Sequence, residues 1–318
     1  SDKDLGFREM VSQPGVFDEY DLTQNSDLGL QANYYATDKL DFGVQLLAKK
    51  RAENSLNKSI QWAYINYNIS PKFAIKVGRV GVGSFMMSDY RHVGFTNLWA
   101  HLPTEFYGAH PVSAVDGMSL VFRKPLSEGL FSARLWSGEP LEQALQNASL
   151  AGWPGAANYA DLTIDDKTVR YYAAGLNYDT ADWLIQSELG VIRTESLLTP
   201  GTFSGYLSVG RKLGAVTPFI IGAWTKATDD RLIMPAPPVG AYIPLQQVSQ
   251  YVFNQFHIAQ HTFSVGARWD VQPKVAIKAQ WDKTWVDEYG SLLLRKQDGA
   301  VAEKRQLDIF SISVDFLF

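Results

Sequence analysis

The sequence predicts an all-β fold of long antiparallel strands, and three observations indicate it. Apolar and polar residues alternate with a period of two over long stretches, as side chains do on the two faces of a strand. These stretches follow one another along the whole chain. Their connections alternate strictly between short turns and long loops. We therefore expect one domain, 1–318, in which successive strands run up and down.

The clearest alternation is at the C-terminal end. From residue 310 to residue 318 every second residue is apolar, and the residues between them include two serines and Asp315. The stretches 259–271 and 274–286 alternate in the same way and are joined by a short turn that contains proline, which predicts a hairpin.

Read in order, the alternation predicts thirteen strands, most of them 10–13 residues long. At ~3.3 Å per residue and a tilt of ~40°, about eleven residues cross ~28 Å, close to the apolar thickness of a bilayer. The predicted strands are 26–37, 40–51, 59–69, 72–81, 115–124, 129–138, 168–179, 182–194, 202–213, 216–228, 259–271, 274–286 and 306–318.

The connections sort by length onto opposite ends of the fold, because each strand reverses the direction of the one before it. Outer-membrane barrels have this asymmetry, with short periplasmic turns and long external loops, whereas soluble sandwiches have no reason for it. The short turns are 38–39, 70–71, 125–128, 180–181, 214–215 and 272–273, and the long loops are 52–58, 82–114, 139–167, 195–201, 229–258 and 287–305.

Thirteen is an odd number, and bacterial single-chain barrels have an even number of strands. We expect a fourteenth strand, either before Ser1 or as a weak strand within 1–14. Sixteen strands is the alternative if a long loop contains a hairpin, for which 229–258 is the best candidate. The predicted fold is thus a transmembrane antiparallel up-and-down β-barrel of fourteen strands.

Three features favour a barrel with its apolar face outward. The polar faces carry groups suited to a water-filled lumen, aromatic residues gather near both strand ends, and no strand has an edge-protecting central proline. The alternative is a soluble β-domain with these aromatics in its core. The side chains that decide are Phe263, Trp269, Ile312 and Phe316, since their enclosure in a sealed interior would exclude a membrane barrel.

Composition excludes several classes of protein. The chain has 33 acidic and 29 basic residues, a net charge of −4, which excludes a basic nucleic-acid-binding protein. Cysteine is absent, which removes disulfides, thiolate metal sites and cysteine catalysis. No stretch approaches the ~18–20 apolar residues of a membrane helix.

No motif predicts a cofactor, a metal ion or an enzyme. His257 and His261 are four apart, but at a strand start this spacing separates them by ~13 Å. A Gly-x-Ser-x-Gly nucleophile elbow is absent. The acidic pairs at 165–166 and 229–230 could bind calcium, but solvated loop residues are the simpler interpretation.

Several stretches resemble one known family. Residues 77–90, followed by 103–108 and 115–118, resemble the trimeric-type general porins of Gram-negative outer membranes, and so does 273–282. The terminal Phe318 is similar to the assembly signal of outer-membrane proteins. The resemblance implies an outer-membrane location, contact with lipid and lipopolysaccharide, and passive diffusion of small polar solutes. The resemblance does not decide whether the protein forms a homotrimer.

The loop 82–114 is the candidate for setting selectivity. With one strand before 26–37 it is the third loop, which in porins resembling this chain folds into the lumen and narrows it. Its thirty-three residues are too many for a plain turn. The loop is also unusually apolar, so we expect it to pack against the barrel wall. Its apolar residues are Phe85, Met86, Met87, Phe95, Leu98, Trp99, Phe106 and Tyr107.

Opposed acids and bases across a pore create a field that orients polar solutes. We expect such a constriction between the loop and the wall. For any one residue, the alternative is a side chain that snorkels or is bonded to the loop backbone. The candidates are Asp89, Arg91, His92 and Glu105 on the loop, and Arg134, Glu188, Arg268, Lys278 and Asp282 on the wall.

The leading hypothesis is an outer-membrane channel. A second is a scaffold or sheath for a partner protein threaded through the lumen, for which small inward residues would leave room. A third is an outer-membrane hydrolase, which would need a histidine in a clear mid-strand position. The small inward residues are Ser204, Ser208, Gly210, Ser264 and Gly266.

Overall fold

The structure is a computed structural model with side chains. It describes residues 5–7, 16, 21–22, 26–49, 59–81, 93–108, 114–126, 129–140, 169–194, 200–231, 233, 243, 250, 254, 257–288, 293–296 and 304–317.

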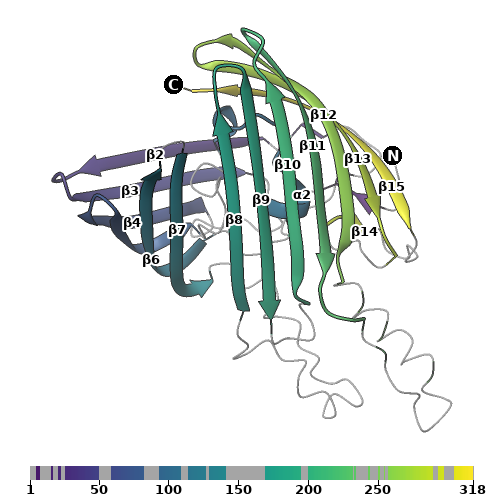
Figure 1. The fold of residues 1–318 in the computed structure, drawn as a ribbon, viewed down its shortest axis with the longest axis horizontal. Coiled ribbons are helices and arrows are strands. Elements are labelled where there is room, and N and C mark those ends of the chain that lie inside the picture. The colour runs from purple at the N-terminus through teal and green to yellow at the C-terminus, as the bar shows by residue number, and fades with distance from the viewer. Residues whose placement is uncertain are drawn as a thin grey trace.

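Thirteen long strands form two antiparallel sheets (Figure 1). The six-stranded sheet contains β2 (Asp27–Tyr35), β3 (Leu40–Lys49), β4 (Ile60–Ser70), β5 (Phe73–Gly81), β6 (Ala114–Leu126) and β7 (Gly129–Pro140). The seven-stranded sheet contains β8 (Val169–Asp179), β9 (Trp183–Thr194), β10 (Thr202–Arg211), β11 (Val216–Ala227), β12 (Ala259–Gln272), β13 (Val275–Val286) and β15 (Arg305–Phe316). In both sheets the strands lie side by side in chain order, so the predicted up-and-down topology is confirmed.

The remaining described elements are short. β1 (Leu5–Gly6) pairs with β14 (Arg295–Lys296). The connection between β5 and β6 contains the 3₁₀ turn η1 (Gly94–Thr96) and the single helical turn α2 (Thr104–Tyr107). No helix among the described residues is long and apolar enough to span a bilayer.

All thirteen predicted strands are present, with ends shifted by a few residues, and short turns alternate with long connections as expected. The predicted fourteenth strand is not found in this part of the chain, because β1 pairs with β14 and not with an edge of either sheet. Most of 229–258, where the sixteen-strand alternative places a further hairpin, lies outside the described residues. A closed barrel of fourteen strands therefore stays a prediction.

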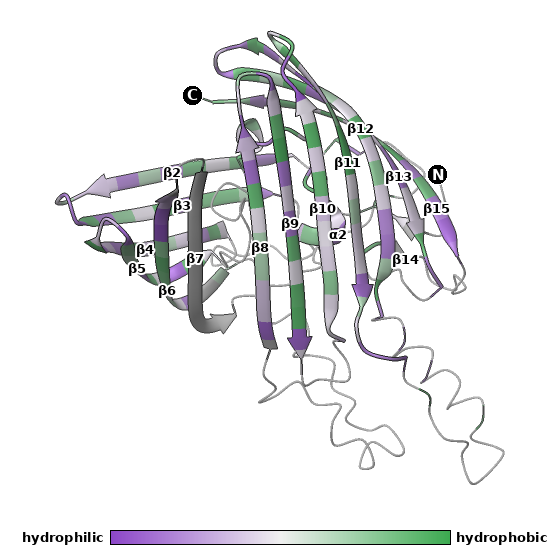
Figure 2. Ribbon diagram, in the orientation of Figure 1, coloured by the Kyte–Doolittle hydropathy of each residue, from purple (hydrophilic) through white to green (hydrophobic). Residues whose placement is uncertain are grey.

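The apolar faces of the strands point outward. Phe263, Trp269, Ile312 and Phe316 are 41%, 50%, 81% and 56% exposed, so they do not form a sealed interior. Figure 2 shows hydrophilic and hydrophobic positions alternating along the strands of the seven-stranded sheet. The inverted arrangement predicted from the sequence is confirmed, and the soluble alternative is excluded.

The inward faces carry polar residues, and many of them are buried. Glu188 on β9, Lys278 and Asp282 on β13, and Ser208 on β10 are almost fully enclosed. They are enclosed because the described part of the β5–β6 loop, residues 93–108, lies against them. In Figure 1, α2 lies behind β10 and β11, and it contacts β10, β11 and β12.

Candidate functional site

The candidate site is the surface where the loop 93–108 meets the inner wall. Apolar packing holds the two together, and burying one large apolar side chain contributes ~1.5–3 kcal/mol. The cluster contains Leu98, Trp99, Leu102, Phe106 and Tyr107 from the loop, and Tyr206, Phe219, Ile221 and Ala223 from β10 and β11.

Trp99 is at the centre of this packing. Its indole N–H donates to the hydroxyl of Ser208 at 2.7 Å, and its ring meets the edge of the Tyr206 ring at a centroid distance of 5.4 Å. Next to it, Leu98 lies over Gly210, where an added Cβ would be 2.8 Å from the leucine Cδ2. Ser208 and Gly210 therefore make room for the loop, whereas the sequence suggested that the small wall residues would make room for a threaded partner.

Glu188 holds the C-terminal end of α2. It accepts hydrogen bonds from the hydroxyls of Tyr107 on the loop and Tyr206 on β10, the second at 2.8 Å. Burial, followed by the neighbouring Glu188 charge, raises the pKa of the Tyr107 hydroxyl well above its ordinary value. Tyr107 therefore stays protonated as a donor to Glu188.

Glu105 holds the other side of α2. Its carboxyl Oε1 accepts a hydrogen bond from Nε2 of Gln260 at 2.7 Å and another from the hydroxyl of Thr262. Burial raises the pKa of Glu105, although both hydrogen bonds act in the opposite direction. A predicted pore-lining acid is thus a buried contact between the loop and β12.

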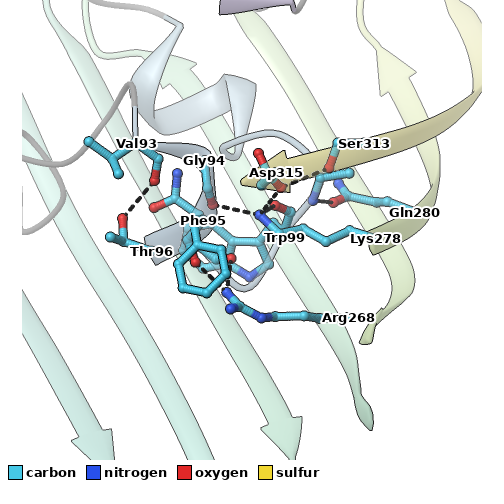
Figure 3. A network of polar contacts seen from close by, with 12 residues as sticks. Val93, Gly94, Phe95, Thr96, Trp99, Arg268, Lys278, Gln280, Ser313 and Asp315 are labelled. Carbon is cyan, nitrogen blue, oxygen red and sulfur yellow. Dashed lines mark hydrogen bonds and ion pairs between the residues drawn. The ribbon is translucent and has the colours of Figure 1, made fainter. Parts of the chain in front are cut away.

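Arg268 on β12 holds the first part of the described loop (Figure 3). Its guanidinium donates to the carbonyl oxygens of Phe95 at 2.6 Å and Asn97 at 2.9 Å, and it forms an ion pair with Asp270 at 2.7 Å. It also lies over the Phe95 ring. Carbonyl oxygens stabilise a cation here without a charged partner on the loop.

Lys278 on β13 reaches the same part of the loop. Its ammonium group donates to the carbonyl oxygens of Gly94 at 2.6 Å and Trp99 at 2.9 Å, and it is 3.0 Å from the Asp315 carboxylate on β15 (Figure 3). The three acceptors match the three N–H donors of a lysine. Lys278 is therefore fully satisfied in a buried position.

Asp282 on β13 holds His101 of the loop. The Nε2 atom of His101 is 2.9 Å from Asp282, and its Nδ1 atom is 3.1 Å from the carbonyl oxygen of Leu102. Both partners are acceptors, so a doubly protonated imidazolium satisfies them. Gln280 donates a further hydrogen bond to Asp282 at 2.8 Å.

These contacts correct the expected arrangement of charges. Glu105 does not face Arg268 and Lys278 across an opening. Glu105 binds side chains of β12 on the wall, and Arg268 and Lys278 bind carbonyl oxygens of the loop. Arg268 and Lys278 bond the loop backbone, which was the alternative for each residue, whereas Glu188 and Asp282 bond loop side chains. Asp89, Arg91 and His92 lie outside the described residues, and for Arg134 the structure gives the backbone pairing of β7, opposite Val121 of β6.

Comparison with known proteins is limited to structure. No family model and no curated protein sequence matches the chain. The outer-membrane protein OmpT of Vibrio cholerae, in a trimer form, has 11% sequence identity and a TM-score of 0.51, covering 92% of this chain and 90% of that chain. The chain has the fold of an outer-membrane β-barrel protein.

Two further barrels are similar at lower TM-scores. OccAB4 of Acinetobacter baumannii has 7% identity and a TM-score of 0.39, covering 92% of this chain and 82% of that chain. A porin refined at 1.8 Å has 10% identity and a TM-score of 0.40, covering 99% and 97%. The predicted outer-membrane location accords with the barrel fold and with the exposed apolar wall.

Proposed function

We propose that this barrel is a passive channel for small hydrophilic solutes and ions across the outer membrane of a Gram-negative bacterium, and that it is not an enzyme. The observation that carries the proposal is a long loop folded onto the polar inner wall of a sheet whose outer face is apolar. An apolar exterior suits lipid, and a polar interior narrowed by a loop suits selective diffusion.

The proposed path runs between the loop and the six-stranded sheet, because the loop covers the inner wall of the other sheet. The inner face of β2 to β5 carries both neutral and charged polar groups. Gln45 donates to Gln31 at 3.1 Å, and the ammonium group of Lys76 lies 4.4 Å from the centre of the Tyr64 ring. Such a surface would favour polar solutes over apolar ones.

The charged constriction is proposed to include Asp89, Arg91 and His92 of the loop and Arg134 of β7. Glu105, Glu188, Arg268, Lys278 and Asp282 would act on permeation indirectly, by fixing the position of the loop. The two groups of residues should therefore give different phenotypes when they are neutralised.

Planar-bilayer recording tests the channel. Purified protein should give open steps of one steady size, and their reversal potential in a salt gradient should shift after Arg134→Gln. Folded protein that inserts but never conducts would contradict the proposal.

The hydrolase alternative has little support in the described residues. The His101–Asp282 pair comes closest to a catalytic dyad, but it is buried and both imidazole nitrogens are engaged. A general base needs a free nitrogen within reach of a substrate. An assay with esters and peptides should therefore show no turnover above that of heat-denatured protein.

The sheath alternative is disfavoured by the same loop, since two of the small wall residues that would admit a partner, Ser208 and Gly210, lie against Trp99 and Leu98. A homotrimer is the proposed assembly, and one structurally similar barrel is described as a trimer form. Lipid and lipopolysaccharide would contact the outer wall. Light scattering of the detergent-solubilised protein should give three times the mass of one chain.

A further inference from the structure

A small cavity lies between the loop and strands β12 and β13. Its volume is about 20 Å³, which is enough for one particle the size of a water molecule. Polar residues from both sides line it, with Phe7 and His101 close to each other at a ring distance of 5.1 Å. The lining residues used below are Glu105, Gln260, Thr262, Gln280, Asp282 and Thr284.

The hydrogen bonds within this lining engage its side-chain donors and leave oxygen atoms available as acceptors. The hydroxyl proton of Thr262 goes to Glu105, so in its 2.7 Å contact with Thr284 the donor is Thr284. Gln260 donates from Nε2 to Glu105, which fixes the orientation of its amide. Gln280 donates from Nε2 to Asp282. These side-chain donors are therefore directed at acceptors within the lining.

One acceptor in the lining is buried without a partner. Gln260 is 4% exposed, and its Oε1 atom accepts no hydrogen bond. Exchanging the two ends of the amide would lose the bond to Glu105, so the orphan oxygen is fixed by the geometry. A buried acceptor of this kind requires a donor or a cation.

The charges around the cavity do not balance. Glu105 and Asp282 are acids, and His101 is bonded to Asp282. The nearby cations Arg268 and Lys278 are engaged with Asp270, Asp315 and loop carbonyls. A buried carboxylate is paired with a cation, coordinates one or takes up a proton, and burial raises the pKa of Glu105, so a cation beside Glu105 would take the place of that proton.

We propose that the cavity binds one small monovalent cation of the sodium class, with oxygen ligands from Glu105, Gln260 and Thr284. A hard cation takes carboxylate, amide and hydroxyl oxygens. Calcium fits less well, because it takes 6–8 oxygen ligands. The described residues also contain no group of three acids or histidines suited to a metal ion.

The cation would fasten the loop to the wall, since its ligands come from α2, β12 and β13. The site depends on the docked loop and not on conduction. A barrel that binds the cation but never conducts would overturn the proposed channel and leave this site standing. A barrel that conducts but does not bind the cation would overturn this site and leave the proposed channel standing.

Thallous ion tests the site directly, because it replaces sodium or potassium and scatters anomalously. Crystals of the full chain, grown in N-methylglucamine salts and soaked in thallous acetate, should show one anomalous peak beside Glu105 and Gln260. Sodium acetate should reduce it. The peak should be lost in Glu105→Gln, whose amide N–H₂ would face the ligand, and kept in Glu288→Gln, a half-exposed acid that pairs with Arg231 and does not line the cavity. A docked loop without a peak, or a peak that survives Glu105→Gln, would overturn the proposal.

A solution measurement avoids dependence on crystals and variants. The midpoint of the near-ultraviolet circular dichroism transition of the wild-type protein should rise with sodium chloride concentration, relative to N-methylglucamine chloride of equal ionic strength. Equal midpoints in the two salts would contradict a sodium site, as would stabilisation by calcium at lower concentrations than sodium.

Discussion

The indole N–H of Trp99 is 2.7 Å from the hydroxyl of Ser208, a residue 109 positions later in the chain. This contact joins the middle of the β5–β6 loop to the middle of β10, and it is enclosed by the apolar cluster around it. The position of the loop in the lumen therefore depends on contacts far apart in the sequence.

Removing the Trp99 side chain should release the loop. Replacing a buried aromatic residue by alanine costs ~3–5 kcal/mol, so Trp99→Ala should leave the loop undocked and raise single-channel conductance, with noisier open states. Trp269→Phe, a change on the exposed outer wall, serves as the control. Conductance identical to wild type in Trp99→Ala would show that the loop does not narrow the path.

Gly94 should tolerate no side chain. An added Cβ would lie 2.0 Å from Oδ1 of Asp315, the carboxylate that pairs with Lys278. Gly94→Ala should therefore lower the stability of the docked loop by ~1–3 kcal/mol, the usual cost of overpacking. The thermal midpoint by near-ultraviolet circular dichroism measures it. In a double-mutant cycle with Asp315→Ala the two losses should be less than additive, and strict additivity would contradict the contact.

Neutralising Lys278 should loosen the loop more than it alters ion preference. Lys278→Met leaves the Asp315 carboxylate and two loop carbonyls without their donor, and breaking a buried ion pair costs ~3–5 kcal/mol. The variant should show altered conductance and a lowered thermal midpoint. Arg134→Gln should instead shift the reversal potential in a salt gradient. A shift of equal size in both variants would mean that Lys278 faces the permeating ions.

A charge on the outer wall should oppose insertion. Ile312→Lys places an ammonium group on a face that is exposed in the structure, at a cost of ~2–4 kcal/mol near the bilayer centre. The folded fraction in lipid vesicles, read from heat-modifiable gel migration, should fall, whereas Ile312→Leu should fold like wild type. Unimpaired insertion of Ile312→Lys would show that this face does not meet lipid.

The docked loop should be most stable at low pH when sodium is absent. Burial raises the pKa of Glu105 above its ordinary value near 4.5, so its contribution is fully present below that value and is lost as the pH rises through the raised pKa. The groups facing it are Asp282 on β13 and His101 on the loop. Thermal midpoints in N-methylglucamine buffers from acidic to neutral pH measure the effect, and Glu105→Gln should flatten the profile over this range.

The strands could be predicted from the sequence because their signal is local. Alternation along 259–271 and 274–286 is the direct result of one apolar and one polar face, and it needs no knowledge of partners. The strand count and closure could not be settled in the same way, since both depend on segments such as 1–14 and 229–258 whose pattern is weak.

The anchoring contacts could not be predicted, because they join residues far apart. Glu105, Arg268 and Lys278 were predicted to face one another across an opening, but their partners include amides, hydroxyls and carbonyls that carry no signal in the sequence. Tyr206 was missed for the same reason. One signal was available: the run Phe219–Ile221 breaks the alternation of β11, which indicates that its inner face is apolar as well as its outer face.

That run has a consequence for biogenesis. Phe219 and Ile221 point into the lumen, where Leu98, Trp99 and their neighbours pack with them. A nascent barrel whose loop is not yet docked would expose these apolar side chains to the water in its lumen. Insertion into the bilayer and docking of the loop are therefore coupled. A chain lacking 93–108 should accumulate as an aggregation-prone precursor bound to chaperones.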